Sequence, residues 1–310
     1  MATPGLYVPV PAIPPRAPQV TLVGSSVQVT DEGDEVVFKF PDGEIAKVFP
    51  ADLKLELEAR QRESWTRGFG YWPENQSAAV VSDPSSNATM SAPSNLAMVK
   101  VQPFAITTTL DATSFGFDTI DYKGRAERQL EIATPSAIES EFWTGTQAQA
   151  SGWPNPYLAN SSTCTTLNSG TAVSIQKGLA ILQDALATSG CGGQGMIHCQ
   201  QGITPNLLNT RRQGKLLLDQ FDNFIVPGVG YPGTKPDGTA PAAGTSWMYA
   251  TDLVMTRVQK DLQMFPDSFA EALDHTQTNT TNSITFRAER LAAAYFDGFR
   301  HFAVLVNLPS

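Results

Sequence analysis

The clearest pattern of hydrophobic and polar positions predicts a long helix near the middle of the chain, in "DYKGRAERQLEIATPSAIESEFWTG". Its apolar residues recur about every 3.6 positions, the period of one helix face, at Ala126, Leu130, Ala133, Ala137, Ile138 and Phe142. Gly145 is expected to end the helix. Because Pro135 lies inside the pattern, we expect either a kink or a restart with Thr134 as the cap.

A second helix is predicted in "TAVSIQKGLAILQDALATSG". Val173, Leu179, Leu182 and Leu186 would face the core, and Gly190 would cap the C-terminal end. A helix is also predicted in "ADLKLELEARQRES", although its leucines alternate with the period of a strand. "TPNLLNTRRQGKLL" is expected to form a capped helix or a turn.

Strand-like segments occur at both ends of the chain. "VTLVGSSVQV", "EVVFKF" and "EIAKVF" are predicted strands, and Pro41-Asp42-Gly43 is a turn. "MVKVQPFAITTTL" predicts a strand pair or one bent strand, and "GMIHCQ" a short strand. The stretch "DNFIVPGVGYPGTKPDGTAPAAGTSWMYATDLVMTRVQKDL" predicts strand, loop and strand, and residues 283–309 predict two strands joined by a turn at Asp297-Gly298. Strands and helices mix without regular βαβ repeats, so the predicted class is α+β.

Two segments have little to place in a core. Residues 1–19 contain six prolines and predict an extended arm. Residues 70–98 are dominated by Ser, Asn, Ala and Pro, and a loop of that length inside a compact domain is expected to act outside its own domain.

Composition and charge limit the classes of function. Charged residues make up only 16% of the chain, and the net charge of −9 argues against binding nucleic acid through its phosphates. With no apolar run of membrane-spanning length and no signal peptide, we expect a soluble, cytoplasmic chain.

"GVGYPG", from Gly228 to Gly233, has the spacing of a dinucleotide-binding loop. Such a loop needs a helix directly after it, because the pyrophosphate lies at that helix N-terminus. Pro232, Pro236 and Pro241 exclude the helix, so a turn-rich loop is predicted instead of a nucleotide site.

The cysteines and histidines predict no metal, cofactor or catalytic site, and the chain is not expected to be an enzyme. Cys164, Cys191 and Cys199 have no C-x-x-C spacing and are expected to be reduced. His198 precedes Cys199 on a predicted strand, so the two side chains should point to opposite faces, which leaves a Cys/His enzyme only through distant partners. His275 and His301 are expected to be structural.

The tetrapeptide RAER occurs at residues 125–128 and again at 287–290. Its arginines are expected to form salt bridges with Glu139, Glu141 or a neighbouring subunit, and phosphate binding is the alternative.

Several short segments together resemble one family. "GRAERQLEIATPSAIESEFWTGT", "GMIHCQQGITPNLL", "FIVPGVGYPGTKPDG", "SWMYATDLVMTRV" and "AERLAAAYFDGFRHFAVLVNL" occur in this order. In order and type they resemble the major capsid proteins of actinobacterial tailed phages, which have the Hong Kong 97 type of shell fold. The resemblance covers roughly residues 99–310.

The resemblance implies a division of the chain. Residues 1–66 would form an N-terminal arm and β-rich extension, 67–104 an extended loop, 105–150 a peripheral domain with a spine helix, 151–280 an axial domain, and 281–310 terminal strands of the peripheral domain. We expect inter-subunit contacts at Pro9, Pro14, Trp72, Arg125, Gly230 and Tyr231.

The implied function is structural: a subunit that assembles through pentamers and hexamers into an icosahedral head shell around double-stranded DNA. The shell would form in the cytoplasm of a bacterial host, with scaffold, portal and decoration proteins as further partners. The alternatives are an encapsulin-like compartment, a minor head protein and a soluble enzyme that uses Cys199 or the glycine-rich loop.

Overall fold

A computed structural model describes residues 20–32, 35–43, 45–50, 69–71, 99–113, 122–189, 194–259, 263–265 and 283–309. Two mixed β-sheets and the helices packed on them confirm the predicted α+β class. Among the described residues, no helix combines the length and apolar character that crossing a membrane requires. The predicted helix at residues 51–64 lies outside the described residues.

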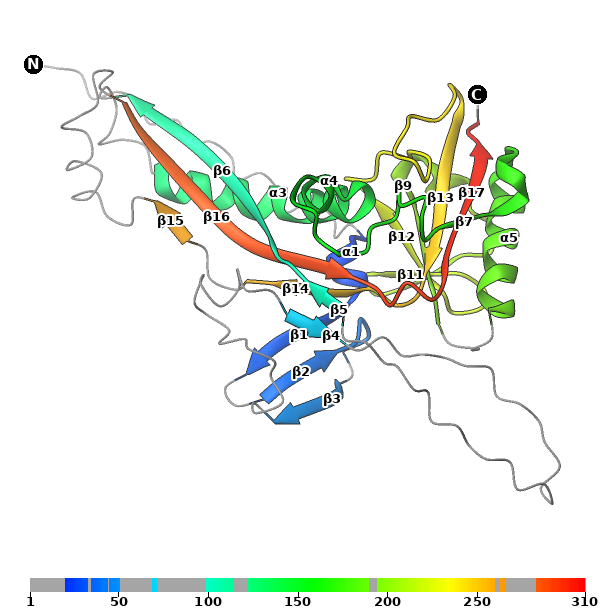
Figure 1. The fold of residues 1–310 in the computed structure, drawn as a ribbon, viewed down its shortest axis with the longest axis horizontal. Coiled ribbons are helices and arrows are strands. Elements are labelled where there is room, and N and C mark those ends of the chain that lie inside the picture. The colour runs from blue at the N-terminus through cyan, green and yellow to red at the C-terminus, as the bar shows by residue number, and fades with distance from the viewer. Residues whose placement is uncertain are drawn as a thin grey trace, which may run out of the picture.

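The first sheet is built around a long two-stranded ribbon. β16 (Ser283–Tyr295) pairs antiparallel with β6 (Phe104–Thr113), from Ser283 opposite Thr113 to Ala292 opposite Phe104. The sheet order is β15-β16-β14-β1-β2-β3, with β6 also on β16. The remaining strands are β15 (Gln263–Phe265), β14 (Met255–Val258), β1 (Val27–Glu32), β2 (Glu35–Lys39) and β3 (Ile45–Pro50). Figure 1 shows β6 and β16 running together along one side of the molecule.

Upstream of the ribbon, the predicted strand pair is two separate strands with different partners. β5 (Val99–Val101) pairs antiparallel with β4 (Phe69–Tyr71), whereas β6 pairs with β16. β4 and β5 therefore form a short hairpin stem, and the residues between them, 72–98, lie outside the described part of the chain.

The second sheet has the order β10-β11-β12-β9-β13-β17-β7, with β8 also on β17. Its central strands are β9 (Met196–Gln200), β12 (Phe224–Gly228) and β13 (Thr245–Thr251), in segments that were predicted to be strands. The others are β10 (Arg211–Gln213), β11 (Leu216–Leu218), β17 (His301–Asn307), β7 (Thr165–Thr166) and β8 (Val173–Ser174).

The predicted long helix is α3 (Tyr122–Thr144), followed by the short α4 (Thr146–Ser151). It ends at Gly145, which has the left-handed φ of 60°. The helix continues through Pro135, so the predicted restart is wrong. Thr134 is not a cap, because its hydroxyl donates to the Leu130 carbonyl at 2.6 Å inside the helix. Pro135 has no backbone N–H, so the same part of the helix lacks one backbone hydrogen bond.

The second predicted helix is α5 (Ile175–Thr188), capped by the Ser174 hydroxyl. It covers one face of the second sheet, where Leu179, Leu182 and Leu186 pack with Ile197 and Val304. The second half of α3 covers the other face, through Ile138, Phe142 and Trp143. The second sheet therefore lies between two helices, and Figure 1 shows α5 at its outer side. The predicted cap Gly190 lies outside the described residues.

Two local predictions need correction, and a third had two alternatives. Part of the first predicted strand is the one-turn helix α1 (Leu22–Ser25), whose Thr21 side chain accepts the Gly24 N–H. Of the helix or turn predicted after β9, the structure has the turn: the 3₁₀ turn η3 (Gln201–Asn206) is followed by the β10–β11 hairpin. The last two strands do not pair with each other: β16 belongs to the first sheet and β17 to the second.

Candidate functional site at the junction of the two sheets

The residues expected at inter-subunit contacts have different surroundings. Pro9, Pro14 and Trp72 lie outside the described residues. Arg125 is exposed near the start of α3, whereas Gly230 and Tyr231 follow β12 and pack beneath that helix. None of these contacts between copies is tested by a single chain, so they stay predictions.

Glu139, on the buried face of α3, joins three distant segments. Its two carboxylate oxygens accept the Leu22 N–H at 2.9 Å and the Gly230 N–H at 3.0 Å. The side chain is fully buried, and this burial raises the pKa of its carboxyl above the ordinary value. The predicted salt bridge between Glu139 and an RAER arginine is therefore wrong, because the carboxylate binds backbone amides.

Gly230 approaches α3 too closely for any side chain. A Cβ atom at this position would lie 2.2 Å from the carbonyl oxygen of Ser136. The second glycine of "GVGYPG" is thus required by contact with a helix of the same chain, and no helix follows the third glycine to receive a phosphate. Val229, which is 52% exposed, presents more surface in this segment than either Gly230 or Tyr231.

Aromatic rings fill the space between α3 and the second sheet. Tyr231 lies with its ring centroid 4.9 Å from that of Trp143 and 5.8 Å from that of His198. Trp143 also packs edge-on against Tyr249 and donates its indole N–H to the Thr234 hydroxyl at 2.8 Å. Such contacts combine apolar burial with satisfied polar groups, so they fix the helix on the sheet.

His198 is held neutral inside this cluster. Its Nδ1 lies 3.0 Å from the Tyr231 hydroxyl and its Nε2 lies 2.9 Å from the Thr251 hydroxyl. Burial, with a smaller contribution from His301, lowers the pKa of His198 to about 3. Cys199 lies in the core beneath α5 on the opposite face, as predicted, and burial raises the pKa of its thiol to about 12.

His301 is structural, as expected from the sequence. Its Nε2 lies 2.9 Å from the Leu158 carbonyl and its Nδ1 3.1 Å from the Thr163 hydroxyl. Burial lowers the pKa of His301 to about 4. A neutral ring can donate through one nitrogen to the carbonyl and accept from the hydroxyl through the other.

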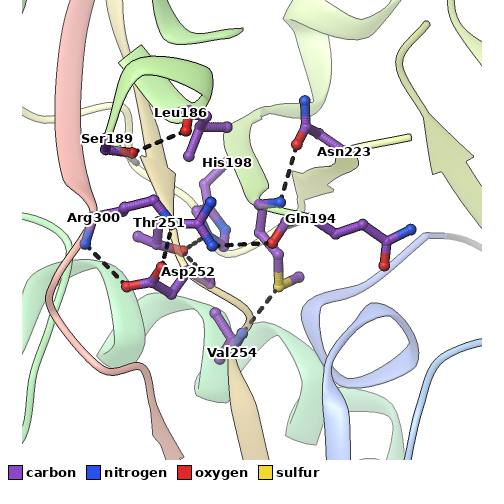
Figure 2. A network of polar contacts seen from close by, with 11 residues as sticks. Leu186, Ser189, Gln194, His198, Asn223, Thr251, Asp252, Val254 and Arg300 are labelled. Atoms are coloured by element: carbon purple, nitrogen blue, oxygen red, sulfur yellow. Dashed lines mark hydrogen bonds and ion pairs between the residues drawn. The ribbon is translucent and has the colours of Figure 1, made fainter. Parts of the chain in front are cut away.

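Two segments that cross from one sheet to the other are joined by a buried ion pair. Asp252 lies between β13 and β14, and Arg300 lies between β16 and β17. Both the backbone N–H and Nε of Arg300 donate to the Asp252 carboxylate, and its Nη2 donates to the Gln194 carbonyl at 3.3 Å. Figure 2 shows Arg300 between Asp252 and Gln194, with Thr251 and His198 beside them. This pair was not predicted from the sequence, although Asp252 directly follows one strand-like segment and Arg300 directly precedes another.

The RAER segments behave differently from each other. The first lies in α3 and the second in β16, as predicted. In the second, Arg287 pairs with Glu289 two residues later, at 2.6 Å. That interaction is a salt bridge of the expected kind with a partner that the sequence did not indicate.

The junction is built for holding segments together. Burial lowers the pKa of His198 and raises the pKa values of Cys199 and Glu139, so it favours the neutral form of each side chain. Within the described ranges, no group of His, Cys, Asp or Glu side chains is arranged to bind a metal ion. Two grooves in the described part of the chain, of about 500 and 430 Å³, are lined by neither His198 nor Glu139.

No protein-family model matches the sequence, and no curated protein matches it. The solved structures similar to the chain include two capsids of GTA particles, structures from Gordonia, Microbacterium and Mycobacterium phages, and an encapsulin complex. The capsid of a native GTA particle has a TM-score of 0.48 and 10% identity, over 99% of this chain and 97% of that one. A structure from Microbacterium phage Oxtober96 has a TM-score of 0.47 and 10% identity, over 99% and 96%. The holo-SrpI encapsulin complex of Synechococcus elongatus has a TM-score of 0.43 and 9% identity, over 68% and 75%.

Proposed function

We propose that this chain is the structural subunit of an icosahedral head shell that encloses the double-stranded DNA of a tailed phage. The order of sequence motifs supports this proposal, and so does a junction whose polar groups bind one another and the backbone. In this proposal the chain is not an enzyme, and Gly228 to Gly233 bind no nucleotide.

The observation that carries the proposal is the way in which α3 spans both sheets. Ala126 and Leu130, in its first half, share a core with Phe104 and Ala288 of the ribbon. Phe142 and Trp143, in its second half, pack against His198 and Tyr249 of the second sheet. A single helix thus fixes a long two-stranded ribbon to a sheet that is covered on both faces, an arrangement suited to a shell subunit that meets its neighbours along its edges.

The acidic net charge of −9 agrees with this function. A wall that neutralised many phosphates would bind DNA tightly, whereas a packed genome must enter and leave. Residues 1–19 and the segment between β4 and β5 are proposed to contact neighbouring copies. Pentamers and hexamers, assembly in the host cytoplasm, and scaffold, portal and decoration partners belong to the same proposal.

Purification of the full chain followed by negative-stain microscopy tests the function. We expect closed, regular particles, and in infected cells particles that contain nuclease-protected DNA. Particles that hold a protein cargo and no DNA would favour an encapsulin-like compartment. A chain that stays monomeric at high concentration, and that forms no particles when expressed together with the other head proteins, would contradict every shell function.

A further inference from the structure

We propose that the second sheet carries both halves of one contact between neighbouring copies. The turn at Phe221 joins β11 and β12 at their ends, near the β10 side of the sheet. It would insert into the groove beside α5, near the β7 side of the sheet in the next copy. The proposal rests on the shell function and specifies how copies would join within a ring.

The projecting half is an ordered turn with an exposed aromatic side chain. Phe221 lies between β11 and β12 and is 63% exposed. One carboxylate oxygen of Asp219 accepts the Phe221 N–H at 2.8 Å and the Asn223 N–H at 2.9 Å. Because the turn is already fixed, little conformational entropy would be lost when Phe221 enters a partner.

The receiving half is an open groove of about 500 Å³ between α5, β17 and the 3₁₀ turn η2 (Leu167–Gly170). Leu167, Ile181 and Phe302 supply its apolar wall and are only partly buried. An apolar cavity of about 150 Å³ is enough to take up benzene, so the groove has room for a phenyl ring.

One row of paired residues crosses the sheet from the strand that follows the turn to the strand that lines the groove. Phe224, just after the turn, pairs with Met196, which pairs with Thr251. Thr251 in turn pairs with His301, the neighbour of the groove residue Phe302. Turn and groove are therefore level along the strand direction, so a rotation without a shift along the strands can join copies. A head-to-tail contact without such a shift gives a ring when its rotation divides a full turn evenly.

Charges distinguish this contact from a pairing of two identical edges. The β10–β11 hairpin, beside the turn, exposes Arg211, Arg212 and Lys215, of which Arg211 pairs with Asp222. The groove has the exposed Asp184 and the C-terminal end of α5, which carries the negative end of the helix dipole. Hairpin against groove brings opposite charges together, whereas hairpin against hairpin brings cations together.

Disulfide trapping in full-length chain tests the contact. Phe221→Cys combined with Ala185→Cys, a groove residue, should give a ladder of disulfide-linked oligomers after mild oxidation of assembled material. The control combines Phe299→Cys with Ala185→Cys, because Phe299 is also an exposed phenylalanine, at 47%. A ladder from the first pair alone supports the proposal; no ladder, or equal ladders, overturns it.

Substitution gives a second readout. Phe221→Asp should weaken ring formation by about thirtyfold, the loss of an aromatic anchor worth about 2 kcal/mol, while circular dichroism stays native. Phe299→Asp should leave ring formation unchanged. Particles of Phe221→Asp that form as readily as wild type would overturn this contact and leave the shell function standing. A wild-type chain that forms neither rings nor particles would overturn both.

Discussion

The two sheets of this chain are covered to different extents. In the second sheet, every residue of β12 is buried and β13 is buried at all but its first residue, because α3 and α5 cover opposite faces. In the ribbon of the first sheet, β6 alternates: Phe104 and Ile106 are buried, whereas Ala105, Thr107 and Thr109 are exposed. The contrast indicates that both faces of the second sheet contribute to the stability of the free subunit. The ribbon has one solvent-exposed row of side chains that other copies could contact.

The largest difference should appear between two positions on α3. Phe142 is 2% exposed at the junction, and Phe142→Ala should lower the free energy of unfolding by about 3–5 kcal/mol. Ile132 is 78% exposed on the same helix, and Ile132→Ala should change it by no more than about 0.5 kcal/mol. Urea denaturation of the unassembled subunit measures both. Equal effects would show that the junction is not the stabilising core.

A buried and an exposed ion pair give the next contrast. Asp252→Asn leaves Arg300, which is 3% exposed, without its counter-charge, and should cost about 3 kcal/mol. Replacing both partners, with Asp252→Asn and Arg300→Met, should recover part of that loss. Lys235→Ala removes the exposed pair with Asp237 and should leave the melting temperature unchanged. A larger loss in the Lys235 variant would contradict the assignment of Asp252 and Arg300 as the structural pair.

The same substitution in the two sheets should have different costs. Thr251→Val removes the hydroxyl beside His198 Nε2 and leaves a buried ring nitrogen without its partner, at about 1–3 kcal/mol. Thr109→Val on the exposed row of β6 should change stability by less than about 0.5 kcal/mol. Thermal unfolding of both variants decides this, and a destabilised Thr109 variant would mean that the exposed row of the ribbon is packed in the free subunit.

Acid should act first on the second sheet. The pKa values of His198 and His301 lie at about 3 and 4, below the value of about 6.5 for an unfolded chain. The unfolded state therefore binds more protons, and stability falls as pH drops from about 6.5 toward 4, by up to about 1.4 kcal/mol per pH unit for each histidine. Glu139 acts in the opposite sense, because its raised carboxyl pKa favours the fold at lower pH. His301→Gln should reduce the slope of the free energy of unfolding against pH by the contribution of one histidine. An unchanged slope would contradict the buried neutral state of His301.

The sequence predicted well those elements whose signal is local. The 3.6-residue period of α3, the apolar face of α5 and the alternation of side chains at His198 and Cys199 all depend on neighbours in the chain. Glu139 could not be assigned in this way, because its partners Leu22 and Gly230 are 117 and 91 residues away. α1 is too short to show a period, and the turn at Gly298 says nothing about which sheet receives β17. Pro135 was misjudged because packing of α3 on two sheets outweighs one missing backbone hydrogen bond.

The position of β17 has a consequence for the order of folding. This strand fills the second sheet between β13 and the pair β7 and β8. Its partners are distant in the sequence, because Asn307 pairs with Thr245 and Val306 pairs with Val173. Pairings between distant residues must close long loops and therefore form slowly. The second sheet, and with it the Phe302 wall of the groove beside α5, would thus be completed after the local turns of α3 and α5 have formed.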